Sequence, residues 1–165
     1  MSATINHYRL KIWLVGPGSP PMRKLHRVIE ISGNAAFAAL HDLILEAFDC
    51  ADEEFYHFLL TRKAIKNLRE LRQCDEEVVG YFDGDEVVAE DGNIIRHDAL
   101  EYTLDDAKLK ENNSIYYWYW FNSDDSWIYR IKIEKIRPVI DTTPEIEGWM
   151  GEVIKKVGPS PALYE

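Results

Sequence analysis

The sequence contains little cysteine and no long apolar run. Cys50 and Cys74 are its only cysteines, and two cysteines without a secretory signal are typical of free thiols in a reducing cytoplasm. No apolar run approaches the ~18 residues of a membrane-spanning helix, and residues 1–13 lack the basic and apolar regions of a signal peptide. We therefore expect a cytoplasmic protein that does not use a membrane as its partner.

The common motifs of catalysis and cofactor binding are absent as well. There is no Cys-x-x-Cys pair, no phosphate-cradling glycine loop and no Gly-x-Ser-x-Gly motif. The stretch "YFDGDEVVAEDGN", residues 81–93, lacks the 12-residue ligand pattern and the terminal glutamate of a calcium loop. From these patterns we expect no metal and no cofactor, and a non-enzymatic role is favoured over an enzymatic one.

Positive charge is in short supply. The formal net charge is −10 at pH 7, which disfavours nucleic-acid binding by the surface as a whole because a polyanion is repelled by an acidic protein. Residues 62–72 nevertheless hold five basic side chains. A solvated helix face is the usual explanation of such a run, and a local basic patch is the alternative.

Apolar residues, by contrast, are plentiful. They make up 46% of the 165 residues, enough for one packed domain over residues 1–165. Alternation of apolar and polar residues predicts strands at 7–15, 25–31 and 127–136, the first two as an antiparallel pair. The aromatic stretch 116–121 is predicted as a further strand.

Helices are predicted between these strands. The firmest is 35–48, where Asn34 is the expected N-cap and apolar residues recur at helical spacing. Further helices are expected at 63–73, at 103–112 with Thr103 as a second N-cap and Asp106 three residues on, and from about 143 to 153. Residues 55–61 fit a strand and a helix equally well, and strands and helices are mixed along the chain.

Three stretches carry a resemblance to a known family. "YRLKIWLVG" from Tyr8 is followed by a Pro-Pro turn, Arg27–Asp49 contains a strand, a glycine turn and a Leu-His-Asp helix, and Phe121–Ile136 combines an aromatic, an Asp-x-Trp element and a charged strand. In this order they resemble the plasmid pRiA ORF-three-like domain family, passenger proteins of insertion elements. The middle segment, about 60–113, diverges from that pattern.

Residue by residue, the resemblance is incomplete. Leu40, His41 and Asp42 match the helix motif, and Asp125 and Trp127 match Asp-x-Trp. Asn122-Ser123-Asp124 stands where Asp-Phe-Gly is usual, Cys50 where tryptophan is frequent, and Glu54 where histidine is frequent. The resemblance implies an α+β domain with a curved, mostly antiparallel sheet packed against helices, two to four in this chain. It also implies that 55–61 is a strand, but it implies no reaction.

Two groups of side chains are candidates for binding nucleic acid or protein. The strand at 116–121 has aromatic side chains on both faces, which predicts a core or an interface, or alternatively a platform for stacked bases. Cations on the outward faces of two strands have the chemistry that phosphates need, and these are Arg9, Lys11, Arg130 and Lys132. One small core does not readily hide Trp13, either Trp118 or Trp120, and Trp149 together. The candidates for an exposed aromatic surface are Trp13, Trp118, Trp120 and Trp127.

A polar site is the third candidate. His41 and Asp42 on the helix, with Asp124 and Asp125 in a loop, supply groups for acid–base chemistry or for a hard cation. Adjacent helical residues do not face each other, so His41 is interpreted as a structural histidine in preference to half of a catalytic pair with Asp42. Asp124 and Asp125 are consecutive residues of types that are common in turns, so an ordinary turn is favoured there.

We therefore expect a protein-interaction module, with an unknown protein partner or with self-association. The alternatives are a nucleic-acid-binding accessory protein and a hydrolase or metal-dependent enzyme that uses His41, Asp124 and Asp125.

Overall fold

The computed structural model describes residues 3–15, 19–49, 56–80, 95–120, 126–141 and 151–160. In these ranges the chain forms an eight-stranded sheet in the order β5-β4-β3-β6-β7-β1-β2-β8. All neighbouring strands are antiparallel except β4 and β5. The strands are β1 (Ala3–Val15), β2 (His26–Ser32), β3 (Tyr56–Leu59), β4 (Glu76–Val79), β5 (Ile95–Asp98), β6 (Ser114–Trp120), β7 (Ser126–Asp141) and β8 (Gly151–Val157).

One α-helix, α1 (Phe37–Ala47), is found in the described ranges, together with one short 3-10 helix, η1 (Leu68–Gln73). The prediction of two to four helices is therefore wrong, and the domain is mainly β. The predicted helix at 63–73 is reduced to η1, and the one at 103–112 is a series of turns. At the C-terminus, residues 151–157 are the strand β8 instead of helix, while 142–150 lie outside the described residues.

Two sequence details explain these differences. A Cβ at Gly151 would lie 2.6 Å from the carbonyl oxygen of Glu30 and 2.8 Å from Cδ1 of Leu43, so this glycine allows β8 to pass closely beside β2 and under α1. Thr103 and Asp106 do form the predicted reciprocal capping bonds, at 3.0 and 3.1 Å. They close a turn, however, and no α-helix follows.

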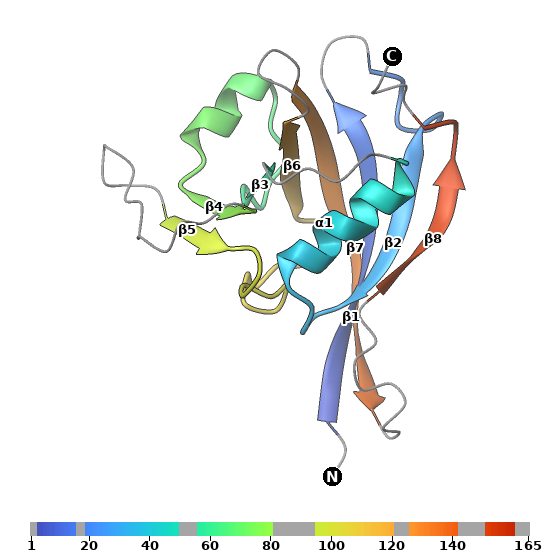
Figure 1. The fold of residues 1–165 in the computed structure, drawn as a ribbon, viewed down its shortest axis with the longest axis vertical. Helices are drawn as coiled ribbons and strands as arrows, with labels where there is room; N and C mark the ends of the chain where they lie inside the picture. Colours follow the sequence, from blue (N-terminus) through green and yellow to red (C-terminus); the bar gives the residue numbers. More distant parts are fainter. Residues whose placement is uncertain are drawn as a thin grey trace.

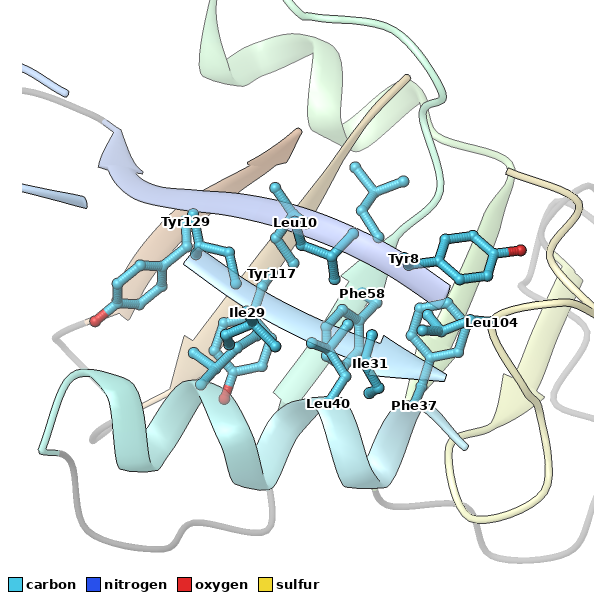
Figure 2. Packing of buried hydrophobic residues seen from close by; sticks show 14 of the residues in the cluster. Tyr8, Leu10, Ile29, Ile31, Phe37, Leu40, Phe58, Leu104, Tyr117 and Tyr129 are labelled. Atoms are coloured by element: carbon cyan, nitrogen blue, oxygen red, sulfur yellow. The ribbon is translucent and has the colours of Figure 1, made fainter. Parts of the chain in front are cut away.

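The helix α1 covers one face of the sheet, which we call the inner face (Figure 1). The apolar side chains that alternate with polar ones along β1 are buried there: Tyr8, Leu10, Ile12 and Leu14. Figure 2 shows Tyr8 and Leu10 of this set with Ile29 and Ile31 of β2 above Phe37 and Leu40 of α1. The predicted antiparallel pairing of the first two strands is confirmed, with Leu10 opposite Ile29.

The opposite, outer face has a smaller apolar cluster at one side. Leu59, Leu71 and Tyr116 are buried in it, and Ile65 packs against it. The backbone N–H of Ile65 also donates a hydrogen bond to the Tyr116 hydroxyl at 3.1 Å. The segment that contains η1 is thereby attached over β3 and β6, so the aromatic strand β6 lies between two apolar clusters.

The loop between β5 and β6 is hydrogen-bonded to β1 through Asp105. Asp105 accepts hydrogen bonds from the Tyr8 hydroxyl at 2.8 Å and from Asn6 Nδ2 at 3.1 Å. Burial and this carboxylate neighbour raise the pKa of Tyr8. The same carboxylate lies against Gly33, so the turn after β2 and the loop are in direct contact.

Candidate functional site

The main charged feature of the outer face lies on the two longest strands, β1 and β7, which run side by side and extend past the end of α1 (Figure 1). Four successive residue pairs between β1 and β7 have side chains on the outer face, and each pair contains at least one basic side chain. We call these eight residues the cationic ladder: His7–Arg137, Arg9–Lys135, Lys11–Lys132 and Trp13–Arg130. Pairs two residues apart are separated by about 6.6 Å, so the ladder is roughly 20 Å long.

A β-bulge in β7 places Lys135 and Arg137, the β7 residues of two of the four pairs, on the outer face. Arg9 pairs with Lys135 whereas Leu10 pairs with Ile133, so Glu134 is an extra residue in β7. Regular alternation from Ile133 would turn Ile136 outward. Past the bulge, Ile136 instead packs against the inner core, and Lys135 and Arg137 take the outer face.

The four cations that the sequence predicted lie together. Arg9 is exposed, whereas Lys11, Arg130 and Lys132 are half-buried. Sequence reasoning missed Lys135, Arg137 and His7. The only signal was the three-residue spacing of Ile133 and Ile136, which does not fit a regular strand.

One end of the ladder is held by contacts between neighbouring strands. The guanidinium of Arg130 lies 5.0 Å from the ring centroid of Trp13, a distance suited to a cation–π interaction. Arg130 Nε also donates a hydrogen bond to the hydroxyl of the buried Ser114 at 3.0 Å. These contacts fix the direction of Arg130, and they occupy one face of the Trp13 ring.

The other end of the ladder contains a small pocket of about 120 Å³. It is lined by His7, Tyr8, Arg9, Glu30, Lys135 and Arg137. Arg9 also lies 3.5 Å from Glu134 across the bulge. Three cations and one carboxylate therefore surround a volume equal to about four water molecules.

A second charged group lies on β4, near the far edge of the sheet. Glu76 accepts from Arg62 at 2.6 Å and contacts His97 Nε2 at 2.9 Å. Burial alone would raise the pKa of the Glu76 carboxyl, but the hydrogen bonds from His97 and Arg62 and their charges bring it below its ordinary value. This geometry is that of a compact ion-pair network.

The neighbouring Glu77 is arranged in the same way on the other face of β4. It pairs with Arg96 and with His57 Nδ1, the latter at 3.6 Å. Burial again opposes ionisation, and the hydrogen bonds from His57 and Arg96 outweigh it, so the pKa of Glu77 is lowered. Both carboxyls are held as carboxylates by cations, which suits a structural role.

The candidate polar site is not assembled within the described residues. His41 is 3% exposed, its Nδ1 lies 2.7 Å from the Tyr117 hydroxyl, and its ring stacks on Tyr56 at 3.6 Å. Asp42 is exposed on a different side of α1. Asp124 and Asp125 lie outside the described residues.

The aromatic candidates separate into core residues and partly covered ones. Tyr117 is buried in the inner core and Tyr116 in the outer cluster. Trp118 is half-buried and packs against the outer cluster, and Trp13 is half-buried beside Arg130. The side chains of Trp120 and Trp127 and the whole of Trp149 lie outside the description.

The described ranges contain neither a cluster of metal-ligating side chains nor a helix that could span a membrane. No group of three or more histidine, cysteine, aspartate or glutamate side chains there is placed to hold a metal ion. None of the helices described there is long and apolar enough to cross a membrane. The described cysteine, Cys74, is a free thiol as the sequence predicted, and Cys50 lies outside the description.

Comparison with solved structures supports the fold. A crystal structure of a protein of unknown function from Methanosarcina mazei Go1 matches with a TM-score of 0.59 at 17% sequence identity. The match covers 92% of this chain and 69% of the other. At this identity the likeness concerns the fold alone.

Comparison with sequences identifies the family. No curated protein gives a significant match. The model of the plasmid pRiA4b ORF-3-like protein family, however, matches residues 6–152, a range that contains most of β1, all of β2 and α1, and the whole cationic ladder. The resemblance carried by the three sequence stretches is thereby confirmed, and the chain belongs to the plasmid pRiA4b ORF-3-like protein family.

Proposed function

We propose that this protein is a non-enzymatic binding module that holds a nucleic-acid strand by its phosphates along the cationic ladder. The observation that carries the proposal is the run of four outward pairs between β1 and β7, each with at least one basic side chain. A row of cations that repeats along two paired strands suits a linear polyanion, because each step meets another charge of the same nucleic-acid chain.

Local charge overcomes the unfavourable net charge. The ladder contains six lysines and arginines, and its acidic neighbours are Glu30, Glu134 and Glu111, whose Oε1 accepts a hydrogen bond from the N–H of Ile136; this leaves +3. Because the whole chain carries −10, the rest of the protein carries −13. A strand is therefore attracted to the ladder and repelled elsewhere, which restricts where it binds.

Recognition is expected to depend on phosphates and not on bases. Tyr116 and Tyr117 are buried, and one face of Trp13 is occupied by Arg130. A stacking platform would need exposed rings beside the cations. We therefore expect weak sequence preference and a steep dependence on salt.

The protein-interaction hypothesis remains a prediction, and it uses the same surface. A partner protein with an acidic, extended segment would meet the same cations. The tryptophans that motivated this hypothesis give it less support, since Trp118 packs against the outer cluster. A linear array of cations favours the nucleic acid.

The test is fluorescence anisotropy of labelled single- and double-stranded oligonucleotides at two salt concentrations. A Lys11→Glu/Lys132→Glu variant is compared with a Lys24→Glu/Lys110→Glu control, which makes the same charge change at two exposed lysines outside the ladder. We expect binding that weakens with salt, and a ladder variant whose logarithmic salt slope is smaller by about 1.4 for a single strand.

Two results would contradict the proposal. One is the absence of binding at low salt, and the other is an equal loss of affinity in the control variant. A polyglutamate peptide is titrated in parallel. Binding of that peptide without binding of any oligonucleotide would replace the proposal by the acidic-protein alternative.

A further inference from the structure

We infer that the pocket at the bulge, between β1, β2 and β7, is a subsite for one phosphoryl group. This inference rests on the proposed function and makes it more specific, because it separates one end of the ladder from the rest. The pocket is lined by Arg9, Lys135 and Arg137, with Glu30, His7 and Tyr8. Its volume of about 120 Å³ is large enough for one tetrahedral oxyanion.

The arrangement of the cations favours a group with several charged oxygens. Arg9 comes from β1, and Lys135 and Arg137 come from β7 beyond the bulge, so the cations approach from two strands. Arginine presents a planar fork of donors that matches the oxygens of a phosphate. Within the described ranges, Lys135 and Arg137 form no ion pair, whereas Arg9 forms one with Glu134.

The carboxylates of Glu30 and Glu134 set the strength of the site. Glu30 lines the pocket and lies opposite Arg9 in the β1–β2 register. Its negative charge opposes an entering anion, and Glu134 neutralises part of the charge of Arg9. Binding of an isolated phosphate is therefore expected to be weak, and removing the Glu30 charge is expected to strengthen it. Neutralising the charge of Arg137 is expected to weaken phosphate binding.

The first experiment uses inorganic phosphate as the probe, followed by amide chemical shifts of the isotope-labelled protein at constant ionic strength. We expect saturable shifts confined to residues around 7–9, 30 and 135–137. Arg137→Gln should weaken phosphate binding by about tenfold, as for loss of one charge-assisted hydrogen bond. Glu30→Gln should tighten it by roughly threefold, since a nearby like charge is removed.

The matched control is Lys132→Gln, which makes the same charge change on the ladder outside the pocket. It should leave phosphate affinity within about twofold, because Lys132 does not line the pocket and its charge acts on the anion only through solvent, at a separation comparable with the screening length of roughly 8–10 Å at 0.1–0.15 M salt. If Lys132→Gln weakens phosphate as much as Arg137→Gln, the ladder holds an adventitious ion only and the subsite is wrong. Phosphate shifts that do not saturate also overturn it.

A second experiment identifies the source of the phosphoryl group. Oligonucleotides with a 5′-phosphate and with a 5′-hydroxyl are compared in the wild type and in Arg137→Gln. A preference for the 5′-phosphate that disappears in Arg137→Gln indicates a strand terminus. Equal binding of both, with phosphate as a competitor in the wild type only, indicates an internal phosphodiester. Either result supports the subsite.

The two proposals fail separately. Phosphate that binds as expected while no oligonucleotide binds leaves the subsite standing as a site for a free phosphorylated small molecule, and the proposed function is then wrong. Oligonucleotides that bind with a normal salt slope while phosphate does not compete leave the ladder intact and remove the subsite.

Discussion

Arg27 is buried in the inner core and donates a hydrogen bond through Nε to the carbonyl oxygen of Ala47 at 2.6 Å. Ala47 is the last residue of α1, so a cation satisfies a carbonyl that has no partner inside the helix. Arg27 also donates to the carbonyl oxygen of Val157 at 2.8 Å and lies 5.0 Å from the Phe48 ring centroid. One side chain of β2 thereby connects the end of α1 with the end of β8.

Replacing this arginine is expected to cost considerable stability. Arg27→Met keeps much of the apolar stem but removes the donor to three carbonyl oxygens, those of Ala47, His26 and Val157, so the free energy of unfolding should fall by about 3 kcal/mol. Urea denaturation followed by far-UV circular dichroism measures the change. Arg23→Met, at an exposed position before β2, is the control and should change stability by less than about 0.5 kcal/mol. Equal effects of the two changes would show that the network is unimportant.

Gly33 and Asp105 are expected to be energetically coupled. A Cβ at Gly33 would lie 2.2 Å from Asp105 Oδ1, so Gly33→Ala must displace the carboxylate that binds Tyr8 and Asn6. We expect a loss of about 1–3 kcal/mol. In Asp105→Ala the obstacle is gone, so the double variant should be less destabilised than the sum of the single ones. Strict additivity in a denaturation-based cycle would contradict this contact.

The carboxyls of β4 predict how stability depends on pH. The pKa of Glu77 in the folded protein is lowered by its partners, mainly hydrogen bonds from His57 and Arg96 acting against burial. The unfolded state therefore binds a proton at higher pH than the folded state. This contribution is complete above the ordinary glutamate pKa of about 4.3 and is lost as the pH falls through the lowered value.

Urea titrations between neutral and acidic pH measure this contribution. Stability should decline below that ordinary pKa in the wild type, and the decline should be shallower in Glu77→Gln. Glu101→Gln, at an exposed turn position, should keep the slope of the wild type. If Glu77→Gln has an unchanged slope, its ion pairs do not contribute to stability.

Cys74 should react slowly with thiol reagents. Burial raises the pKa of this thiol, and the thiol donates a hydrogen bond to the carbonyl oxygen of Glu76 at 3.1 Å, which also favours the protonated form. The thiolate is the reactive species. A Cys50→Ser variant should therefore react with an aromatic disulfide reagent at least about tenfold more slowly than glutathione at the same pH. A rate equal to that of glutathione would contradict the prediction, and the denatured variant serves as the positive control.

Local sequence patterns predicted the elements whose residues alternate or recur regularly. The apolar side chains that alternate in 7–15 are the ones buried on the inner face of β1. The residues with helical spacing from Phe37 onward form α1. In both cases the period of apolar residues records directly which side faces the core. The family resemblance correctly decided that residues near 55–61 form a strand, where propensity alone was ambiguous.

The start of α1 shows where local reasoning stops. Asn34 was expected as the N-cap, but the cap position is Ala36 and no side chain bonds there. The N–H groups of Phe37 and Ala38 instead donate to the carbonyl oxygens of Tyr102 and Ala99, both at 2.9 Å. A loop distant in sequence thus replaces the local cap, and no pattern near Asn34 indicates it.

The sequence by itself determined the family, the inward faces of the first strands, the main helix and four cations of the ladder. The tertiary structure alone decided that Gly151–Val157 pairs with β2 as a strand, and that Lys135 and Arg137 join Arg9 on the outer face. The physical reason is the same for both. Strand pairing and bulges are set by contacts between residues far apart in the chain, and these contacts override the periodicity and propensity of the local sequence.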